Sequence, residues 1–335
     1  MKTGELTDSV KNRTVFRQLY KGLVSNTGNT RSHMPERAAP EGQSGALPEQ
    51  VISTVGPLPG YAKMPWRQVT AAANSLVADG AEPQTLLLQG LLSKDTEESV
   101  LRETMRRFAA EAEIFGLSFS DANIQVSGCV SMPQYFVTGT GTRCGPARRI
   151  LSPGQELVVV RQIGLAGTAA LVWTHETGLL EHFPTWLVEH AKGLDRWMPI
   201  TEAVGAVNHF GGCSMRRIAQ GGIFNALWEM ADLSGVGLEV DLRKIPVYQE
   251  TIEICEYFDV NPYYLYSEGA LLVGTDRAEA LTAALADAGI FAAAIGMVTD
   301  GNDRVICNGE NRRYLDRPQQ DELWKFSEKK NNCTC

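Results

Sequence analysis

The sequence predicts a two-domain α/β protein, and three observations support this fold class. The chain has 335 residues, which by length predicts two domains of ordinary size. Hydrophobic residues make up 44% of it and charged residues 21%, so each half can bury a core. In each half, short apolar segments alternate with segments of helical periodicity, a pattern that places helices against a sheet. A connection rich in Gly, Pro and Arg predicts a boundary near residue 150.

The first 49 residues divide into two segments by composition. Apolar residues recur at helical spacing between positions 8 and 23, so we predict an N-terminal helix within residues 1–24. Residues 25–49 are rich in Ser, Asn, Gly, Pro, Glu and Gln and contain no aromatic residue. Such a segment buries too little apolar surface to offset the entropy lost on ordering, and it predicts a mobile loop.

The first domain, residues 50–150, is expected to contain three strands and two helices. Apolar segments bounded by turn residues predict the strands 50–54, 85–92 and 135–140. One helix is predicted over 68–78, with Gly80 as its left-handed stop. The second is expected to start after an Asp95 N-cap, with Glu98 at capping-box distance.

The second domain, residues 151–326, repeats the alternation of strands and helices and is followed by a polar tail, 327–335. Its strands are expected at 157–163, 236–242, 270–274, 291–298 and 304–307. Helices are expected after Gly167 and over 223–234, 248–259 and 277–288, the last capped by Asp276. The dipeptide Asp300–Gly301 predicts a hairpin between the last two strands.

Charge and composition exclude several classes of protein. The formal net charge is −8, whereas surfaces that bind nucleic acid or anionic membranes carry basic patches. No stretch reaches the roughly 18–20 apolar residues that a membrane span needs, and the N-terminus lacks a secretory pattern. The seven cysteines form no disulfide framework, so we expect reduced thiols, with Cys129, Cys255 and Cys307 buried. We therefore predict a cytoplasmic protein that binds neither nucleic acid nor membrane.

One long segment carries a family resemblance. Residues 221–246, GGIFNALWEMADLSGVGLEVDLRKIP, resemble the C-terminal domain of the aminoimidazole ribonucleotide synthetase superfamily, and within it the hydrogenase-maturation dehydratase branch. Shorter matches occur at 74–83, 163–168, 254–258 and 267–269, so the resemblance extends over roughly residues 50–325. The resemblance implies two α/β domains and a dimer in which two N-terminal sheets form a closed barrel. It also implies that ATP is bound and that magnesium is held by Asp side chains, since phosphoryl transfer depends on charge neutralisation.

Other residues occupy the positions where this family carries its carboxylates. The glycine-rich loop expected between residues 22 and 50 contains no Asp, and the segment 121–125 stands in for the family's Gly-Gly-x-Thr-Glu turn. The remaining expected acidic positions hold Val55, Ser75, Gln125 and Arg217. Uncharged side chains offer no carboxylate oxygen to a hard cation, and a guanidinium repels it. The sequence thus predicts that the fold is kept, that the metal positions are degenerate and that no metal site remains.

Two glycine turns, two arginines and one acidic residue are weak candidates for nucleotide or anion binding. Backbone N–H groups at a helix start bind phosphate, but the same glycines also allow a tight strand-to-helix turn. We favour the structural role because no metal-binding partner accompanies them. The candidates are Gly164, Gly167, Arg216, Arg217, Gly221, Gly222 and Glu268.

The sequence predicts no catalytic residue. The five histidines lack zinc-ligand spacing, and neither a nucleophile elbow nor a Cys/His arrangement is present. The hydrogenase-maturation branch ends in a Cys that carries a carbamoyl group, and this chain ends in Cys335. The branch's Pro-Arg-x-Cys ending is absent, so we assign Cys335 no role.

The leading interpretation is a superfamily member without ATP-magnesium chemistry and without an expected cofactor. It would act as a binding partner, either as a homodimer or in a heterodimer with an intact relative. The alternative is an ATP-dependent dehydratase or small-molecule kinase, with ATP and magnesium bound through relocated ligands. The carboxylates available for that relocation are Asp79, Asp121 and Glu268.

Overall fold

The computed structural model describes residues 4–5, 11–19, 49–58, 60–144 and 150–326. The predictions for the loop 25–48, the tail 327–335 and Cys335 lie outside these residues. The chain divides into two compact units. The first comprises Met1–Leu76 and Gly80–Gly145, and the second comprises Val77–Asp79 and Pro146–Cys335.

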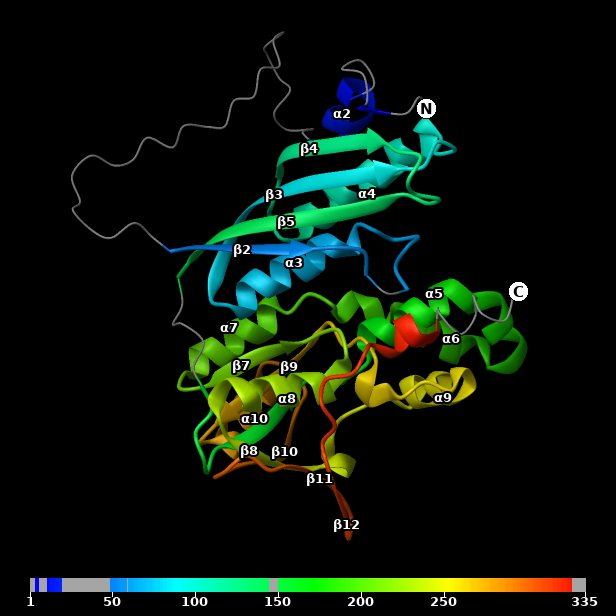
Figure 1. Ribbon diagram of the computed structural model, residues 1–335. Helices are drawn as coiled ribbons and strands as arrows, with labels where there is room; N and C mark the ends of the chain where they lie inside the picture. Colours follow the sequence, from blue (N-terminus) through cyan, green and yellow to red (C-terminus); the bar gives the residue numbers. More distant parts are fainter. Residues whose placement is uncertain (1–3, 6–10, 20–48, 59, 145–149, 327–335) are drawn as a thin grey trace, which may run out of the picture. The chain divides into compact units, whose positions relative to one another are not determined.

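The first unit contains a five-stranded sheet with the order β1-β4-β3-β5-β2 (Figure 1). Strands β3 and β4 pair in parallel, and the other neighbours pair antiparallel. The strands are β1 (Gly4–Glu5), β2 (Gln50–Val55), β3 (Ala81–Leu92), β4 (Phe119–Val126) and β5 (Gln134–Arg143). Side chains alternate between the two faces, so one face supplies the core and the other is open.

Two helices cover the core face of this sheet. They are α3 (Arg67–Ala78) and α4 (Glu98–Ile114). Leu101, Met105, Phe108 and Ala112 recur at helical spacing on α4 and pack with Leu86, Leu88 and Val137 of the sheet. The expected N-terminal helix is represented by the short segments Lys11–Phe16 and α2 (Arg17–Leu19), which pack against α4.

Three local predictions in the first unit are wrong. The segment 121–125 is not a turn but part of β4, an element that the sequence did not predict. Helix α4 has Glu97 at its N-cap without a side-chain cap, so Asp95 and Glu98 form no capping box. Instead, the Glu98 carboxylate accepts hydrogen bonds from Arg13 (2.8 Å) and Thr14 (2.9 Å). Cys129, expected to be buried, is exposed.

The second unit contains a seven-stranded sheet with the order β12-β11-β8-β10-β6-β9-β7 (Figure 1). Only the β8–β11 pair is parallel among these described strands. The strands are β6 (Glu156–Val160), β7 (Ser214–Ile218), β8 (Gly237–Asp241), β9 (Ala270–Thr275), β10 (Ala292–Thr299), β11 (Arg304–Asn308) and β12 (Asn311–Tyr314).

Helices cover both faces of the second sheet. Leu157 and Val159 of β6 pack in one core with α8, while Val158 and Val160 pack in another with α7 and α10. The helices are α5 (Leu165–His182), α6 (Thr185–Lys192), α7 (Thr201–Phe210), α8 (Gly222–Ser234), α9 (Gln249–Phe258) and α10 (Ala278–Asp287). The predicted α/β fold class is therefore confirmed.

The predicted hairpin at Asp300–Gly301 is wrong. Strands β10 and β11 do not pair with each other, because β8 lies between them. The connection crosses the end of β8, where the Leu238 amide donates to the Asp303 carbonyl (2.8 Å). The expected Asp276 cap is also wrong, since α10 starts after Arg277 without a side-chain cap.

Candidate functional site

Two strand-to-helix turns of the second unit approach the same segment, residues 263–269. The turn before α5 contains Gly164 (φ 74°), and the turn before α8 contains Gly221 (φ 77°) and Gly222 (φ 64°). A Cβ atom at Gly222 would collide with the Tyr263 carbonyl, and one at Gly167 would collide with Leu265 and the Tyr266 carbonyl. Glycine is therefore required here by close backbone approach as well as by positive φ.

Hydrogen bonds join the turns to this segment. The Gly164 amide donates to Ser267 Oγ (2.8 Å), and the Gly167 amide donates to the Tyr266 carbonyl (2.8 Å). The Ser267 amide in turn donates to the Ala219 carbonyl (3.2 Å) beside the α8 turn. The Gly164 and Gly167 amides at the start of α5, a candidate site for an anion, thus donate to protein atoms.

A carboxylate from the C-terminal segment lies at the start of α8. Asp321 is almost fully buried, and its Oδ2 accepts a hydrogen bond from the Gly221 amide (2.7 Å). Asn225 holds the same segment through two bonds with the Gln319 backbone (2.8 and 2.9 Å). Burial raises the pKa of Asp321 to about 6, although backbone N–H donors, including that of Gly221, oppose this shift.

Sequence reasoning missed Asp321 and Asn225. Asp321 stands 100 residues from Gly221 in the chain, and no motif links the two positions. The sequence offered one local signal, an Asp of the kind that caps a turn or helix. In the structure Asp321 accepts such a hydrogen bond from the Leu323 amide (3.0 Å). That signal predicts a turn and not a contact with a distant helix.

A buried ion pair lies next to the α8 turn. Arg217 Nη1 of β7 is 2.6 Å from Glu268 Oε2, and Tyr266 donates its hydroxyl to the same oxygen (3.3 Å). Glu268 is fully buried, whereas the Arg217 side chain is 27% exposed. Burial is the largest single influence on the pKa of Arg217 and lowers it. The charges of Glu268, Tyr266 and Asp79 and the hydrogen bond to Glu268 together outweigh burial, so the pKa is raised above its ordinary value. The guanidinium therefore stays charged.

The two arginines proposed together as anion ligands pair with different acids. Arg216 forms an ion pair with Glu229 of α8, while its neighbour Arg217 binds Glu268. Successive residues of a strand point to opposite faces of the sheet. The structure thus pairs Arg217 with Glu268 and directs Arg216, from the other face of the strand, to Glu229 of α8.

The first unit does not bring its proposed metal positions together. Val55 ends β2 and packs against the core, whereas Gln125 is exposed on β4. Strands β5 and β3 separate these two strands, a spacing of roughly 14 Å. Ser75 lies on helix α3 and is half-buried. Asp121 is exposed on β4 and accepts a hydrogen bond from the Ala122 amide (2.8 Å).

The residues at these positions do not fit magnesium and ATP. Val55 has no donor atom, Ser75 and Gln125 offer only uncharged oxygens, and Arg217 is a cation. Within the described ranges, no three His, Cys, Asp or Glu side chains are grouped as metal ligands would be. None of the helices in those ranges is both long and apolar enough to cross a membrane.

Comparison with known proteins assigns most of the second unit to a domain family. Residues 152–308 match the family model of the AIR synthase related protein, C-terminal domain. The second unit thus contains an AIR-synthase-related C-terminal domain. Carbamoyl dehydratase HypE of Rhodobacter capsulatus is 28% identical over 224 residues, which are 64% of this chain and 62% of the relative. The match thus spans about three fifths of that relative's length.

Solved structures resemble the chain over more of its length. A crystal structure of E. coli HypE has a TM-score of 0.74 at 19% identity and covers 95% of this chain and 99% of that one. HypE in complex with ATP has a TM-score of 0.68 at 19% identity, covering 94% and 95%. A HypE–HypF complex has a TM-score of 0.65 at 20% identity, covering 80% and 90%. At these identities the likeness establishes the two-domain fold.

Proposed function

We propose that this AIR-synthase-related chain is a binding partner in a hydrogenase-maturation-type assembly and carries out no magnesium-dependent ATP chemistry. The observation that carries the proposal is the Arg217–Glu268 pair. The resemblance places a metal-binding Asp at position 217, and a guanidinium stands there, 2.6 Å from a fully buried carboxylate. The fixed positive charge of the Arg217 guanidinium neutralises Glu268 and repels a divalent cation.

The rival function, an ATP-dependent dehydratase or kinase, needs relocated ligands. Two of the three available carboxylates, Asp79 and Glu268, already attract Arg217. The third, Asp121, lies on the open sheet face of the first unit. Two of the relatives, a carbamoyl dehydratase and a HypE structure in complex with ATP, favour this rival function.

Calorimetric titration separates the two functions. ATP titrated into the full chain, with and without magnesium, is expected to give no magnesium-dependent heat at millimolar nucleotide, because the described part of the chain offers no carboxylate set for the metal. Micromolar, magnesium-dependent binding would overturn the proposal.

The open face of the first sheet is the proposed partner surface. Its side chains are uncharged for the most part, and Ile52 is 67% exposed on the edge strand β2. Phe136 and Leu91 are each more than a third exposed on the same face, whereas helices cover the opposite face. An uncovered sheet with apolar side chains and an unpaired edge is suited to association with a second sheet. The family resemblance implies a dimer in which two such sheets form a closed barrel, so the proposed second sheet belongs to another copy or to an intact relative.

A charge on this face tests the partner surface. Ile52→Lys is expected to dissociate the homodimer, or the mixed dimer with an intact hydrogenase-maturation relative, because it places an unpaired charge in an apolar contact. Analytical ultracentrifugation of the variant, alone and mixed, measures the loss.

Ile114→Lys is the matched control, since Ile114 is 60% exposed at the end of α4, away from the open face. If Ile52→Lys associates as the control does, the open face is not the partner surface.

A further inference from the structure

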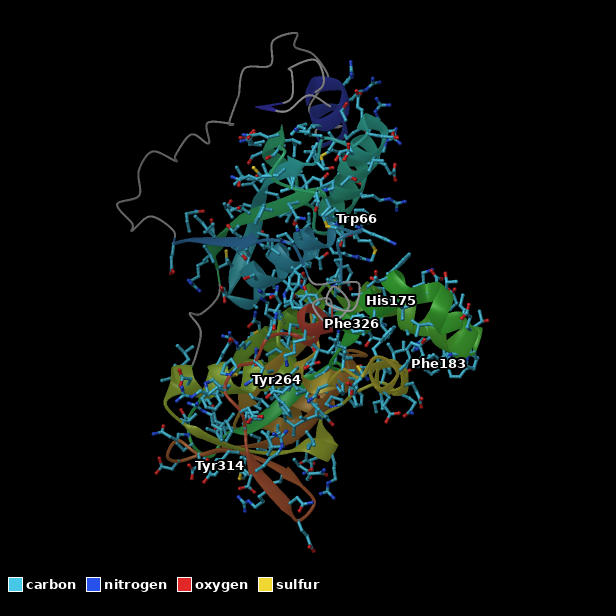
Figure 2. The ribbon with its side chains drawn as sticks, turned by 45° about the vertical axis from the view of Figure 1, so that its right-hand side comes forward. Trp66, His175, Phe183, Tyr264, Tyr314 and Phe326 are labelled. Atoms are coloured by element: carbon cyan, nitrogen blue, oxygen red, sulfur yellow. The ribbon has the colours of Figure 1, made fainter. Side chains whose placement is uncertain are left out.

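A continuous series of aromatic rings runs across one end of the second unit, away from the Arg217 site. It begins at Phe326, which contacts His175 (centroids 5.3 Å apart) and Phe258 (5.1 Å). Tyr257 extends the series from Phe258 (4.9 Å) to His182 (4.9 Å) and Phe183 (5.6 Å). Figure 2 shows Phe183 on the outer helices and His175 beside Phe326. Nothing in the proposed function uses these rings.

The outer members of the series are exposed. Tyr257 is 40% exposed at the end of α9, and Leu180 is 42% exposed near the end of α5. Trp186, three residues beyond Phe183 at the start of α6, is 65% exposed. We refer to Leu180, His182, Phe183, Trp186 and Tyr257 as the aromatic corner. Large exposed aromatic side chains that gather in one place mark protein-binding surfaces, where Trp and Tyr supply most of the affinity.

The charge around the aromatic corner has a single sign. The segments that form it, residues 177–189 and 251–260, contain five acidic residues and no Lys or Arg. Four of the five are exposed: Glu181, Glu189, Glu256 and Asp259. An acidic rim around exposed aromatic faces is complementary to a cation, which gains both ion pairing and cation–π attraction.

The same helices already hold one lysine in this way. Lys192 Nζ lies 4.4 Å from the centroid of Trp173 and 2.6 Å from Glu176 Oε1. This intramolecular contact combines an aromatic face with a carboxylate. The segments of the aromatic corner supply both kinds of group and contain no Lys or Arg.

From these observations we infer that the aromatic corner docks a cationic, lysine- or arginine-bearing segment of a partner protein. The Lys or Arg side chains stack on Trp186 and Tyr257, and Glu181 and Glu256 neutralise them. The aromatic corner belongs wholly to the second unit, so it is a partner contact separate from the open sheet face of the first unit. This inference does not depend on the absence of ATP chemistry.

Binding of a defined probe to the full chain tests this inference. The probe is a dye-labelled peptide of six arginines, with its six-citrulline counterpart as the uncharged isostere, followed by fluorescence anisotropy. The arginine peptide is expected to bind and the citrulline peptide not to bind. Trp186→Ala, Tyr257→Ala and the double variant Glu181→Gln/Glu256→Gln should each weaken binding roughly threefold to tenfold. Raising the salt concentration should weaken it further, since exposed charges are screened.

Two control variants separate specific docking from general attraction to an acidic protein. Tyr314, on β12, is 68% exposed, and Tyr314→Ala removes an aromatic ring elsewhere on the second unit. Glu310→Gln removes an exposed acidic charge elsewhere. Both controls are expected to bind the arginine peptide as the wild type does. Circular dichroism checks that every variant is folded.

Three results would overturn the inference. Equal weakening by the corner variants and the controls would mean that only net charge attracts the peptide. Self-association of the wild type that Trp186→Ala abolishes would mean that a second copy covers the corner. Binding that appears only after deletion of residues 327–335, which include Lys329 and Lys330, would mean that the chain's own tail occupies it.

Discussion

Arg217→Ala is expected to lower the free energy of unfolding by roughly 3–5 kcal/mol, because it leaves the buried Glu268 carboxylate without its cation. The Tyr266 hydroxyl would remain as a donor to that oxygen. Urea unfolding followed by tryptophan fluorescence measures the loss. Arg216→Ala is the control on the same strand, and it should cost no more than about 1 kcal/mol because its partner Glu229 is exposed.

A compensating variant distinguishes charge from packing. Arg217→Met combined with Glu268→Leu removes both charges while keeping most of the side-chain volume, and it should restore most of the stability lost in Arg217→Ala. A result in which Arg217→Ala costs no more than Arg216→Ala would show that Glu268 does not depend on Arg217.

Asp321→Asn is expected to change how stability depends on pH. Asp321 has a folded pKa of about 6, above the unfolded value of about 3.9, so the folded state binds its proton more tightly. The contribution of Asp321 is therefore fully present below about pH 4 and is lost as pH rises to about 6, by roughly 3 kcal/mol at most. The free energy of unfolding of the wild type, minus that of Asp321→Asn, should therefore fall between about pH 4 and pH 6 and stay constant above about pH 6.

The difference between the two proteins is the quantity to measure, because carboxylates such as Glu98 titrate in both. Arg13 lowers the pKa of Glu98 to about 2, so its contribution falls as the solution is acidified, the opposite direction. Urea unfolding at several pH values gives the two curves. A constant difference between them would show that Asp321 does not titrate in this range.

Local patterns predicted the second unit better than the first. Period-2 alternation located β8, and the glycines at positions 221, 222 and 235 located both ends of α8. Strand β4 was missed because two successive polar residues, Ser120 and Asp121, interrupt its alternation after Phe119. The hairpin prediction failed because β8, about 60 residues earlier in the chain, takes the place beside β10.

The candidate site was only partly accessible from the sequence. The glycine turns, and the expectation of an acidic residue at the position that Arg217 holds, follow from motifs of the family resemblance. The partner of Arg217 lies 51 residues away in the chain. Asp321 accepts a hydrogen bond from the Gly221 amide, which lies 100 residues away in the chain. Contacts between distant segments depend on how the chain crosses over the sheet, and spacing within a motif carries no information about that path.

Titration of ATP with and without magnesium into the wild-type chain tests most directly whether the arginine at position 217 has replaced a metal ion. An intact hydrogenase-maturation relative that binds magnesium and ATP serves as the positive control. We predict that magnesium adds nothing to nucleotide binding by this chain. Tight nucleotide binding that requires magnesium would contradict that replacement.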